Sequence, residues 1–174
     1  MVDASNPSTL QYVNSISTPL AVNISLSTIK SEGDYLFASF ANAHNLYVYY
    51  TGTSPANPTY VATIPTYGWN LDFKIDNSKL YILNSWTGLA DDYKLKIYDI
   101  SYPTSIFEIG SIPFTAATPV KLDVNNNIAA VIHDEGVLEL YDVSNPAAIN
   151  LVSSLPVSVG ATSVVLMEGY VAVS

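Results

Sequence analysis

Two patterns of hydrophobic and polar positions alternate along the chain and predict β-strands throughout. Residues 71–75 alternate apolar and polar side chains with a period of two, as half-buried strands do. After a polar turn, residues 80–83 are continuously apolar, which is typical of a strand buried on both faces. A third, alternating strand follows at residues 94–98. No window of a dozen residues shows helical periodicity, so an all-β fold is expected.

The strand pattern repeats four times. Segments that begin at Val2, Tyr50, Tyr98 and Tyr141 align without a gap over fifteen positions, so the spacings are 48, 48 and 43 residues. Two proline columns mark the repeat, formed by Pro7, Pro55, Pro103 and Pro146, and by Pro65, Pro113 and Pro156 with Ser17 in the first copy. We therefore predict a single domain or domain segment over 1–174, built of repeat units at approximately 2–49, 50–97, 98–140 and 141–174.

Four short antiparallel strands in each unit of this length are the signature of a β-propeller blade. A β-solenoid is the structural alternative, although its coils are usually shorter and its strands parallel. The chain begins at the end of a third strand and stops after a second strand, which gives one fourth strand, three full blades and two further strands. We expect three and a half to four blades, as a piece of a larger propeller or with the gap filled by a neighbouring subunit or another segment.

The repeat resembles a known family. Residues 141–146, followed by residues 151–155 and 169–173, are similar to the LVIVD repeat, and residues 98–103 match almost as well. The resemblance covers essentially the whole chain and implies a β-propeller of the bacterial and archaeal kind that is often found at the cell surface. The family usually has Asp after the second strand, where this chain has Ser39, Asn84, His133 and Ser174.

Charge and composition exclude several functions. Only 12% of the residues are charged, the basic ones are six lysines without any arginine, and the net charge is −9. Nucleic acids and anionic membrane surfaces need more positive charge than this, so neither is an expected partner. There is no cysteine, and the longest apolar run, residues 128–132, is too short to span a bilayer. Residues 1–7 do not have the pattern of a secretory signal.

The clearest departure from the repeat is the long loop at residues 85–93, and inserted loops on rigid scaffolds often carry function. Trp86 and Tyr93 would stack on a sugar ring, while Asp91 and Asp92 would accept hydroxyl hydrogen bonds or bind Ca²⁺. His133 lies in a loop that is expected on the same propeller face, so these five residues form the candidate ligand site. The structural alternative is a solvated loop, with His44 and His133 as exposed loop histidines.

Other polar and aromatic residues have simpler explanations. Asp3, Asp99 and Asp142 share one repeat column, where a carboxylate is expected to accept local backbone N–H bonds. Trp69 is expected to pack between blades. The acidic groups at residues 72–77 and 134–135 do not follow the calcium-loop spacing, and no catalytic motif occurs. We therefore assign no catalytic residue and no metal ligand.

These observations favour a non-enzymatic scaffold or protein-interaction module, outside the cell or at its surface, that assembles with protein partners or copies of itself. An unfilled strand position would accept an added strand. The alternative is a carbohydrate-binding module or hydrolase whose site lies on the inter-strand loop face with Trp86, Asp91, Asp92 and His133.

Overall fold

The computed structural model confirms an all-β fold, and it describes residues 2–3, 11–12, 26–40, 44–52, 54, 56–85, 93–114 and 118–174. Three antiparallel sheets have four strands each, and two further sheets have two strands each. The strands are β1 (Val2–Asp3), β2 (Gln11–Tyr12), β3 (Leu26–Glu32), β4 (Tyr35–Phe40), β5 (Asn45–Tyr50), β6 (Thr59–Pro65), β7 (Trp69–Asp76), β8 (Lys79–Ser85), β9 (Tyr93–Asp99), β10 (Phe107–Pro113), β11 (Pro119–Asn125), β12 (Ile128–His133), β13 (Val137–Asp142), β14 (Asn150–Pro156), β15 (Val164–Met167) and β16 (Tyr170–Val173). A single 3₁₀ turn, η2 (Pro146–Ala148), is the only helical element in this part of the chain, and it is far too short to cross a membrane.

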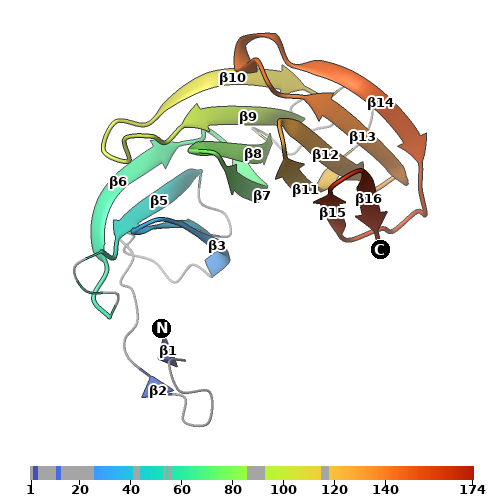
Figure 1. Ribbon diagram of the computed structural model, residues 1–174. Helices are drawn as coiled ribbons and strands as arrows, with labels where there is room; N and C mark the ends of the chain where they lie inside the picture. The colour runs from blue at the N-terminus through green and yellow to red at the C-terminus, as the bar shows by residue number, and fades with distance from the viewer. Residues whose placement is uncertain are drawn as a thin grey trace.

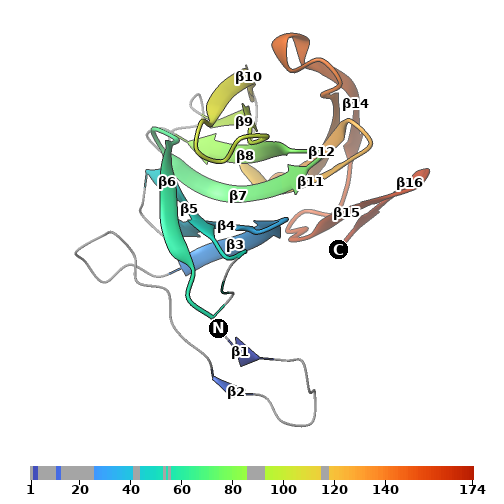
Figure 2. The ribbon, with the colours of Figure 1, turned by 60° about the vertical axis from the view of Figure 1, so that its left-hand side comes forward.

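The sheets follow one another as blades of an open arc. The first blade is β3–β6, the second is β7–β10 and the third is β11–β14, and the β15–β16 hairpin comes after them. Figure 1 shows the first strand of each blade on the concave side of the arc and the fourth strand on the convex side. In the turned view the blades remain separate sheets set side by side (Figure 2). The sheets therefore have the arrangement expected of propeller blades, without closing into a ring.

The turn between the first and second strand of a blade is built by residues that tolerate a left-handed backbone. Asn77 and Ser78 have φ angles of 49° and 57°, and Asn126 and Asn127 have 50° and 62°. Two successive positive φ angles match the right-handed twist of the strands that a two-residue hairpin joins, and asparagine accepts this conformation at low cost. The polar turns that the sequence predicts are thus tight hairpins, and they fix the register of each blade.

The register corrects the gapless alignment of the repeats in one copy. Tyr98 and Tyr141 each lie opposite the second residue of the preceding strand. In the first blade, Tyr49 takes that position instead of Tyr50. The pairs are Leu36–Tyr49, Leu80–Tyr98 and Ala129–Tyr141. The connection from β5 to β6 is one residue longer than its counterparts, because Tyr49 pairs with Tyr60 while Tyr98 pairs with Glu108. The equivalent column is therefore Tyr49, Tyr98 and Tyr141.

Apolar cores lie between the blades. The core between the first and second blades includes Phe37, Val48, Phe73, Leu80 and Tyr98. The core between the second and third blades includes Tyr81, Ile97, Val124, Ala129 and Tyr141. A smaller core joins the third blade to the β15–β16 hairpin through Ala130, Ile132, Leu138, Ala161 and Val164. The second strand of each complete blade is buried on both faces, and in the second and third blades these flanking cores explain its continuous apolar pattern.

Buried carboxylates connect the first strands of neighbouring blades. Asp72 of β7 accepts a hydrogen bond from the backbone N–H of Leu122 in β11 at 3.2 Å, and the ammonium group of Lys121 lies 3.5 Å from the same carboxylate. Lys74 pairs in return with Asp123 at 2.8 Å. A buried carboxylate is stable only with such partners. The acidic residues 72–76 therefore include an inter-blade connector, in addition to the turn charge at Asp76.

A glycine sets how closely the second and third blades approach at the convex side. A Cβ atom built on Gly110 of β10 would lie 1.8 Å from the carbonyl oxygen of Pro146 in η2. Only the absence of a side chain allows this contact between the two blades. The Ser-x-Pro turn of the third blade thus packs directly on the outer strand of the second.

Candidate functional site

The predicted ligand loop is only partly within the described residues. Trp86, Asp91 and Asp92 lie outside them, so the carbohydrate or Ca²⁺ role of this loop stays a prediction. Tyr93 is the first residue of β9 and is 8% exposed, as part of the core between the second and third blades. Its ring is therefore packed within the protein in this structure, where it does not offer a stacking surface to solvent. Within the described ranges, no group of three His, Asp or Glu residues is placed to hold a metal ion.

His133 is buried, so the expectation of an exposed loop histidine is wrong for this residue. It is 2% exposed, because β12 continues through it and it pairs with Val137 of β13. Its Nε2 atom lies 2.8 Å from a carboxylate oxygen of Glu139. The hydroxyl of Tyr141 donates a hydrogen bond of 2.6 Å to the same oxygen. By contrast, His44 is exposed as predicted.

The ring of Phe114 packs against two members of the Glu139 cluster. The ring of Phe114 lies 5.3 Å from the ring of His133 and 5.7 Å from that of Tyr141, both in edge-on geometry. Burial, and then the hydrogen bond to Glu139, raise the pKa of Tyr141, so its hydroxyl remains protonated as a donor at neutral pH. The three polar groups satisfy one another between the blades, which is a stabilising arrangement for groups buried this deeply.

Asp99 and Asp142 of the recurring aspartate column behave as predicted, while the side chain of Asp3 lies outside the described residues. Asp99 accepts a hydrogen bond from the backbone N–H of Ser101 at 2.8 Å, and Asp142 accepts one from Ser144 at 2.9 Å. The Ser side chain and then its backbone N–H lower the pKa of each carboxyl group. Trp69 differs from prediction, since it is 42% exposed and belongs to none of the apolar cores. These residues form turns and surface, and they do not converge on a site.

In the two complete interfaces, three residues from the third strand and the turn after it fill a slot on the preceding blade. Tyr98, Ile100 and Ile106 fill the slot between the first and second blades. Tyr141, Val143 and Ile149 occupy the equivalent slot between the second and third blades. The slot walls are also equivalent, and they consist of Tyr35, Val48, Ile75 and Leu80 in the first case and of Ile97, Val124 and Ala129 in the second. A third strand thus supplies both hydrogen bonds and the apolar filling of its blade interface.

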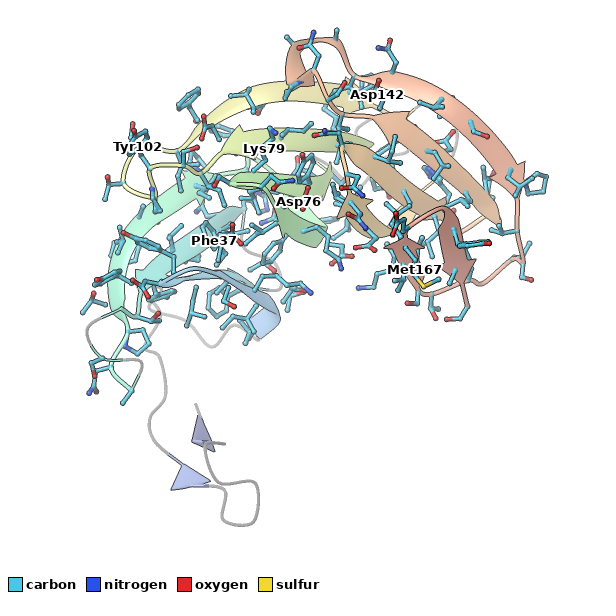
Figure 3. All side chains as sticks on the ribbon, in the orientation of Figure 1. Phe37, Asp76, Lys79, Tyr102, Asp142 and Met167 are labelled. Carbon is cyan, nitrogen blue, oxygen red and sulfur yellow. The ribbon has the colours of Figure 1, made fainter. Side chains whose placement is uncertain are left out.

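The corresponding slot on the third blade is an open groove. It has a volume of about 310 Å³ and lies between the third blade and the β15–β16 hairpin. Its apolar walls are Ile128, Leu140, Leu166, Met167 and Val171, and all of these except Met167 match wall positions of the filled slots. Met167 and Tyr170 are 50% and 75% exposed, and Met167 is visible on the hairpin at the end of the arc (Figure 3). We call this feature the terminal groove.

The outer edge of β16 borders the terminal groove and has no partner strand among the described residues. The equivalent strands β4, β8 and β12 are each paired on both sides. Ser163 and Ser174 exchange two backbone hydrogen bonds across the hairpin. In an antiparallel pair, residues that are hydrogen-bonded to the partner strand alternate with residues whose N–H groups point to the other side. Counted from Ser174, the N–H groups of Val171 and Val173 therefore point away from β15. The edge therefore offers unpaired donors and acceptors to an added strand.

The hairpin that carries this edge is anchored to the third blade. Asp123 accepts a hydrogen bond of 2.7 Å from the backbone N–H of Leu166, while its other oxygen pairs with Lys74. Ala161 and Val164 are 5% exposed and belong to the small core beneath the hairpin. The first strand of the hairpin is therefore fixed to the third blade.

A second hollow, of about 450 Å³, lies between the first and second blades on the concave side. Lys30 and Lys74 line it from equivalent positions of β3 and β7, together with Ile29, Ser31, Leu36 and Ile75. Lys74 is already paired with Asp123. No acidic partner of Lys30 is recorded in the described portion of the chain, so the hollow is weakly positive in an otherwise acidic protein.

Comparisons with known proteins support the fold. No protein-family model matches the sequence, and no curated protein matches it. Among solved structures, the computationally designed Ika8 protein superposes with a TM-score of 0.63 at 10% identity, over 84% of this chain and 41% of that chain. A putative 6-phosphogluconolactonase from Bacteroides fragilis gives 0.61 at 9% identity, over 77% and 40%. A chain of the nidogen/laminin complex gives 0.52 at 10% identity, over 76% and 47%.

These likenesses decide the architecture. The chain is an open arc of a β-propeller. It spans less than half the length of each of these three structures. At such low identity the similarity concerns the fold alone. The terminal groove was not identified in the sequence, although the strand count that locates it, two strands after three full blades, was available there.

Proposed function

We propose that the protein is a non-enzymatic propeller scaffold that self-associates by adding a β-strand to the outer edge of β16. The unpaired edge beside an open apolar groove is the observation that carries this proposal. Strand addition combines main-chain hydrogen bonds, which provide affinity, with side-chain pockets, which provide specificity. Both components are present on the β15–β16 hairpin.

The fourth-strand edges of the complete blades differ from the edge of β16. The fourth strands β6, β10 and β14 end in Pro65, Pro113 and Pro156. Proline cannot donate a backbone hydrogen bond, and its presence on an edge strand protects against unwanted pairing. β16 has no proline, and its counterparts in complete blades are buried central strands. The prolines on these fourth-strand edges, which β16 lacks, support β16 as the place of association.

A location outside the cell or at its surface is part of the proposal. It rests on the resemblance of the repeat to the LVIVD family and on the low charge of the chain. Protease treatment of intact cells of the native host tests it, since a surface protein is degraded while cytoplasmic markers survive. Survival of the protein until the cells are lysed would refute this location.

The association is tested by light scattering on the purified chain after size-exclusion chromatography, over micromolar to millimolar concentrations. We expect the wild type to associate and Val171→Pro to be monomeric, because proline removes an outward N–H group that the hairpin itself does not use. Ser154→Pro is the matched control. The N–H group of Ser154 also points outward, but on the edge of β14. The bond from the N–H group of Val157 to the carbonyl of Gly136 sets the alternation on this strand, and Ser154 then falls on an outward position.

Circular dichroism and thermal unfolding establish that both proline variants are folded. The proposal is supported when Val171→Pro alone loses association. It is overturned when the wild type is monomeric at every concentration, or when Val171→Pro associates as strongly as the wild type.

A further inference from the structure

We infer that the hollow between the first and second blades binds a small organic carboxylate, which takes the place of a carboxylate that the protein itself supplies at the following junctions. The donors are the ammonium groups of Lys30 and Lys74 and the backbone N–H group of Ile75, and all three residues line the hollow. The strands that carry them, β3 and β7, lie on the concave side of the arc (Figure 1). This site is separate from the edge of β16 and does not rest on the proposed function.

The junctions that follow along the arc show what the hollow lacks. Between the second and third blades, the carboxylate of Asp72 accepts a hydrogen bond from the N–H group of Leu122 at 3.2 Å. Between the third blade and the β15–β16 hairpin, Asp123 accepts one from the N–H group of Leu166 at 2.7 Å. At both junctions, a carboxylate on one first strand binds a backbone N–H group of the next first strand.

The strand register places Lys30 where the third blade has Asp123. Lys30 pairs with Phe37 and Asp123 pairs with Ala130, and each partner is the third residue of its second strand. A lysine therefore stands in the first blade at a position where the third blade provides a carboxylate. Since an ammonium group has only donors, it cannot accept a hydrogen bond from the next blade.

The backbone donor at this junction is the N–H group of Ile75. Ile75 pairs with Leu80, the second residue of β8, just as Leu166 pairs with Val171, the second residue of β16. The N–H group of Leu166 points out of its hairpin toward the preceding blade, so the N–H group of Ile75 points out of β7 in the same way. No hydrogen bond from it to the described residues of the first blade is recorded.

The protein contains a template for the bound carboxylate. The carboxylate of Asp123 is held by the ammonium group of Lys74 at 2.8 Å and by the N–H group of Leu166. The hollow offers the same two kinds of donor in Lys30 and Ile75, and Lys74 adds a second ammonium group that has donors to spare. An anion between the lysines replaces the repulsion of like charges by charge-assisted hydrogen bonds.

The rest of the lining favours an organic carboxylate over a bare ion. Ile29, Leu36 and Ile75 give the hollow an apolar part, and its volume is about 450 Å³. Small-molecule sites combine such apolar walls with a few placed polar groups in hollows of this size. A carboxylate with a short apolar chain, such as hexanoate, matches both parts of the lining.

Isothermal titration calorimetry of the full chain with hexanoate tests the site. We expect acetate and hexanol to bind more weakly than hexanoate, because acetate lacks the apolar chain and hexanol lacks the charge. Lys30→Gln should weaken hexanoate binding about tenfold or more, as the loss of a hydrogen bond to a charged group does. Lys94→Gln is the charge-matched control, because Lys94 is exposed on β9 and is not part of the lining.

Lys30→Asp provides a reciprocal test. This substitution supplies the carboxylate from within the chain, so hexanoate binding should be lost while the temperature of thermal unfolding rises. Nuclear magnetic resonance locates the site in the wild type. The amide signal of Ile75 should shift when hexanoate is added, whereas that of Leu166 should change little, because its N–H group already has a carboxylate partner.

Circular dichroism establishes that each variant is folded. The inference is overturned when hexanoate shows no saturable binding to the wild type, or when Lys30→Gln binds it as tightly as the wild type does. It is also overturned when hexanol or inorganic phosphate binds as tightly as hexanoate. Val171→Pro should bind hexanoate like the wild type, so a failure of this inference leaves the proposed self-association standing, and the reverse also holds.

Discussion

The three blade interfaces differ in one respect, which is whether a third strand covers them. In the two complete interfaces, Tyr98 and Tyr141 close the apolar slot and are 4% exposed. In the last interface the same wall positions line an open groove, and the residues of β16 are partly or fully exposed. The walls alone therefore do not determine whether an interface is core or binding surface. The residues that fill the slot determine whether the interface is core or open surface. Each prediction below tests this difference between the filled and the open interfaces.

The largest effect is expected when a filled slot is emptied. Tyr141→Ala removes a buried ring from the second interface and should lower the free energy of unfolding by about 3–5 kcal/mol, as other buried aromatic deletions do. Urea unfolding followed by circular dichroism measures the change. Tyr170→Ala is the control in the open interface, since Tyr170 is 75% exposed and its removal should change stability by less than about 0.5 kcal/mol. Similar losses for the two variants would contradict the comparison.

A smaller and more local effect is expected at Asp123. Asp123→Ala removes the acceptor for the N–H group of Leu166 and the partner of Lys74, which should cost about 1–3 kcal/mol. Because the bond joins the hairpin to the third blade, amide hydrogen exchange should accelerate first in β15 and β16. Asp76→Ala is the control, since Asp76 bonds the neighbouring Asn77 and no other blade. Unchanged exchange at Leu166 would show that the anchor is unimportant.

The smallest effect is expected in the surface turns. Hydrogen bonds from Ser144 lower the pKa of Asp142 in the folded protein, so its contribution to stability is present above the ordinary carboxyl pKa of 3.8 and is lost as the pH falls below it. Asp142→Asn should therefore make the acid-side decline in stability slightly shallower. Denaturant midpoints measured between neutral pH and the acid limb test this. Asp134→Asn, in an exposed turn, is the control. An equal change in the acid-side decline of stability for this variant would contradict a special role of the Asp142 turn.

Strand order, blade repetition and the role of the aspartate column were all predictable from the sequence, because they depend on local patterns. The continuous apolar run predicted the burial of β8, and the recurring aspartate column predicted the backbone bonds that Asp99 and Asp142 accept. The alternation at residues 71–75 did not predict that Asp72 is buried. The one-residue shift in the first blade was not predictable in the same way. Tyr49 and Tyr50 are both strand-forming aromatic residues, so the run of tyrosines hides the longer turn.

Contacts between distant residues account for the other differences. His133 looked like a loop histidine because its partner, Glu139, belongs to the next strand, and only the register of β12 with β13 brings the two together. The connections of Asp72 to Leu122 and of Asp123 to Leu166 cross from blade to blade and leave no trace in spacing. The terminal groove is lined by ordinary strand residues, so it can be recognised only by comparing it with the filled slots.

Gly110 has a consequence for the geometry of any ring that these blades form. Its missing side chain lets the outer strand of the second blade touch the turn of the third, and a Cβ atom there would collide with backbone that cannot rotate away. A larger residue would act as a wedge on the convex side and change the angle between the two blades. In a closed assembly, that angle sets how many blades complete a full turn. A single hydrogen atom in place of a methyl group thus helps to determine the curvature of the arc.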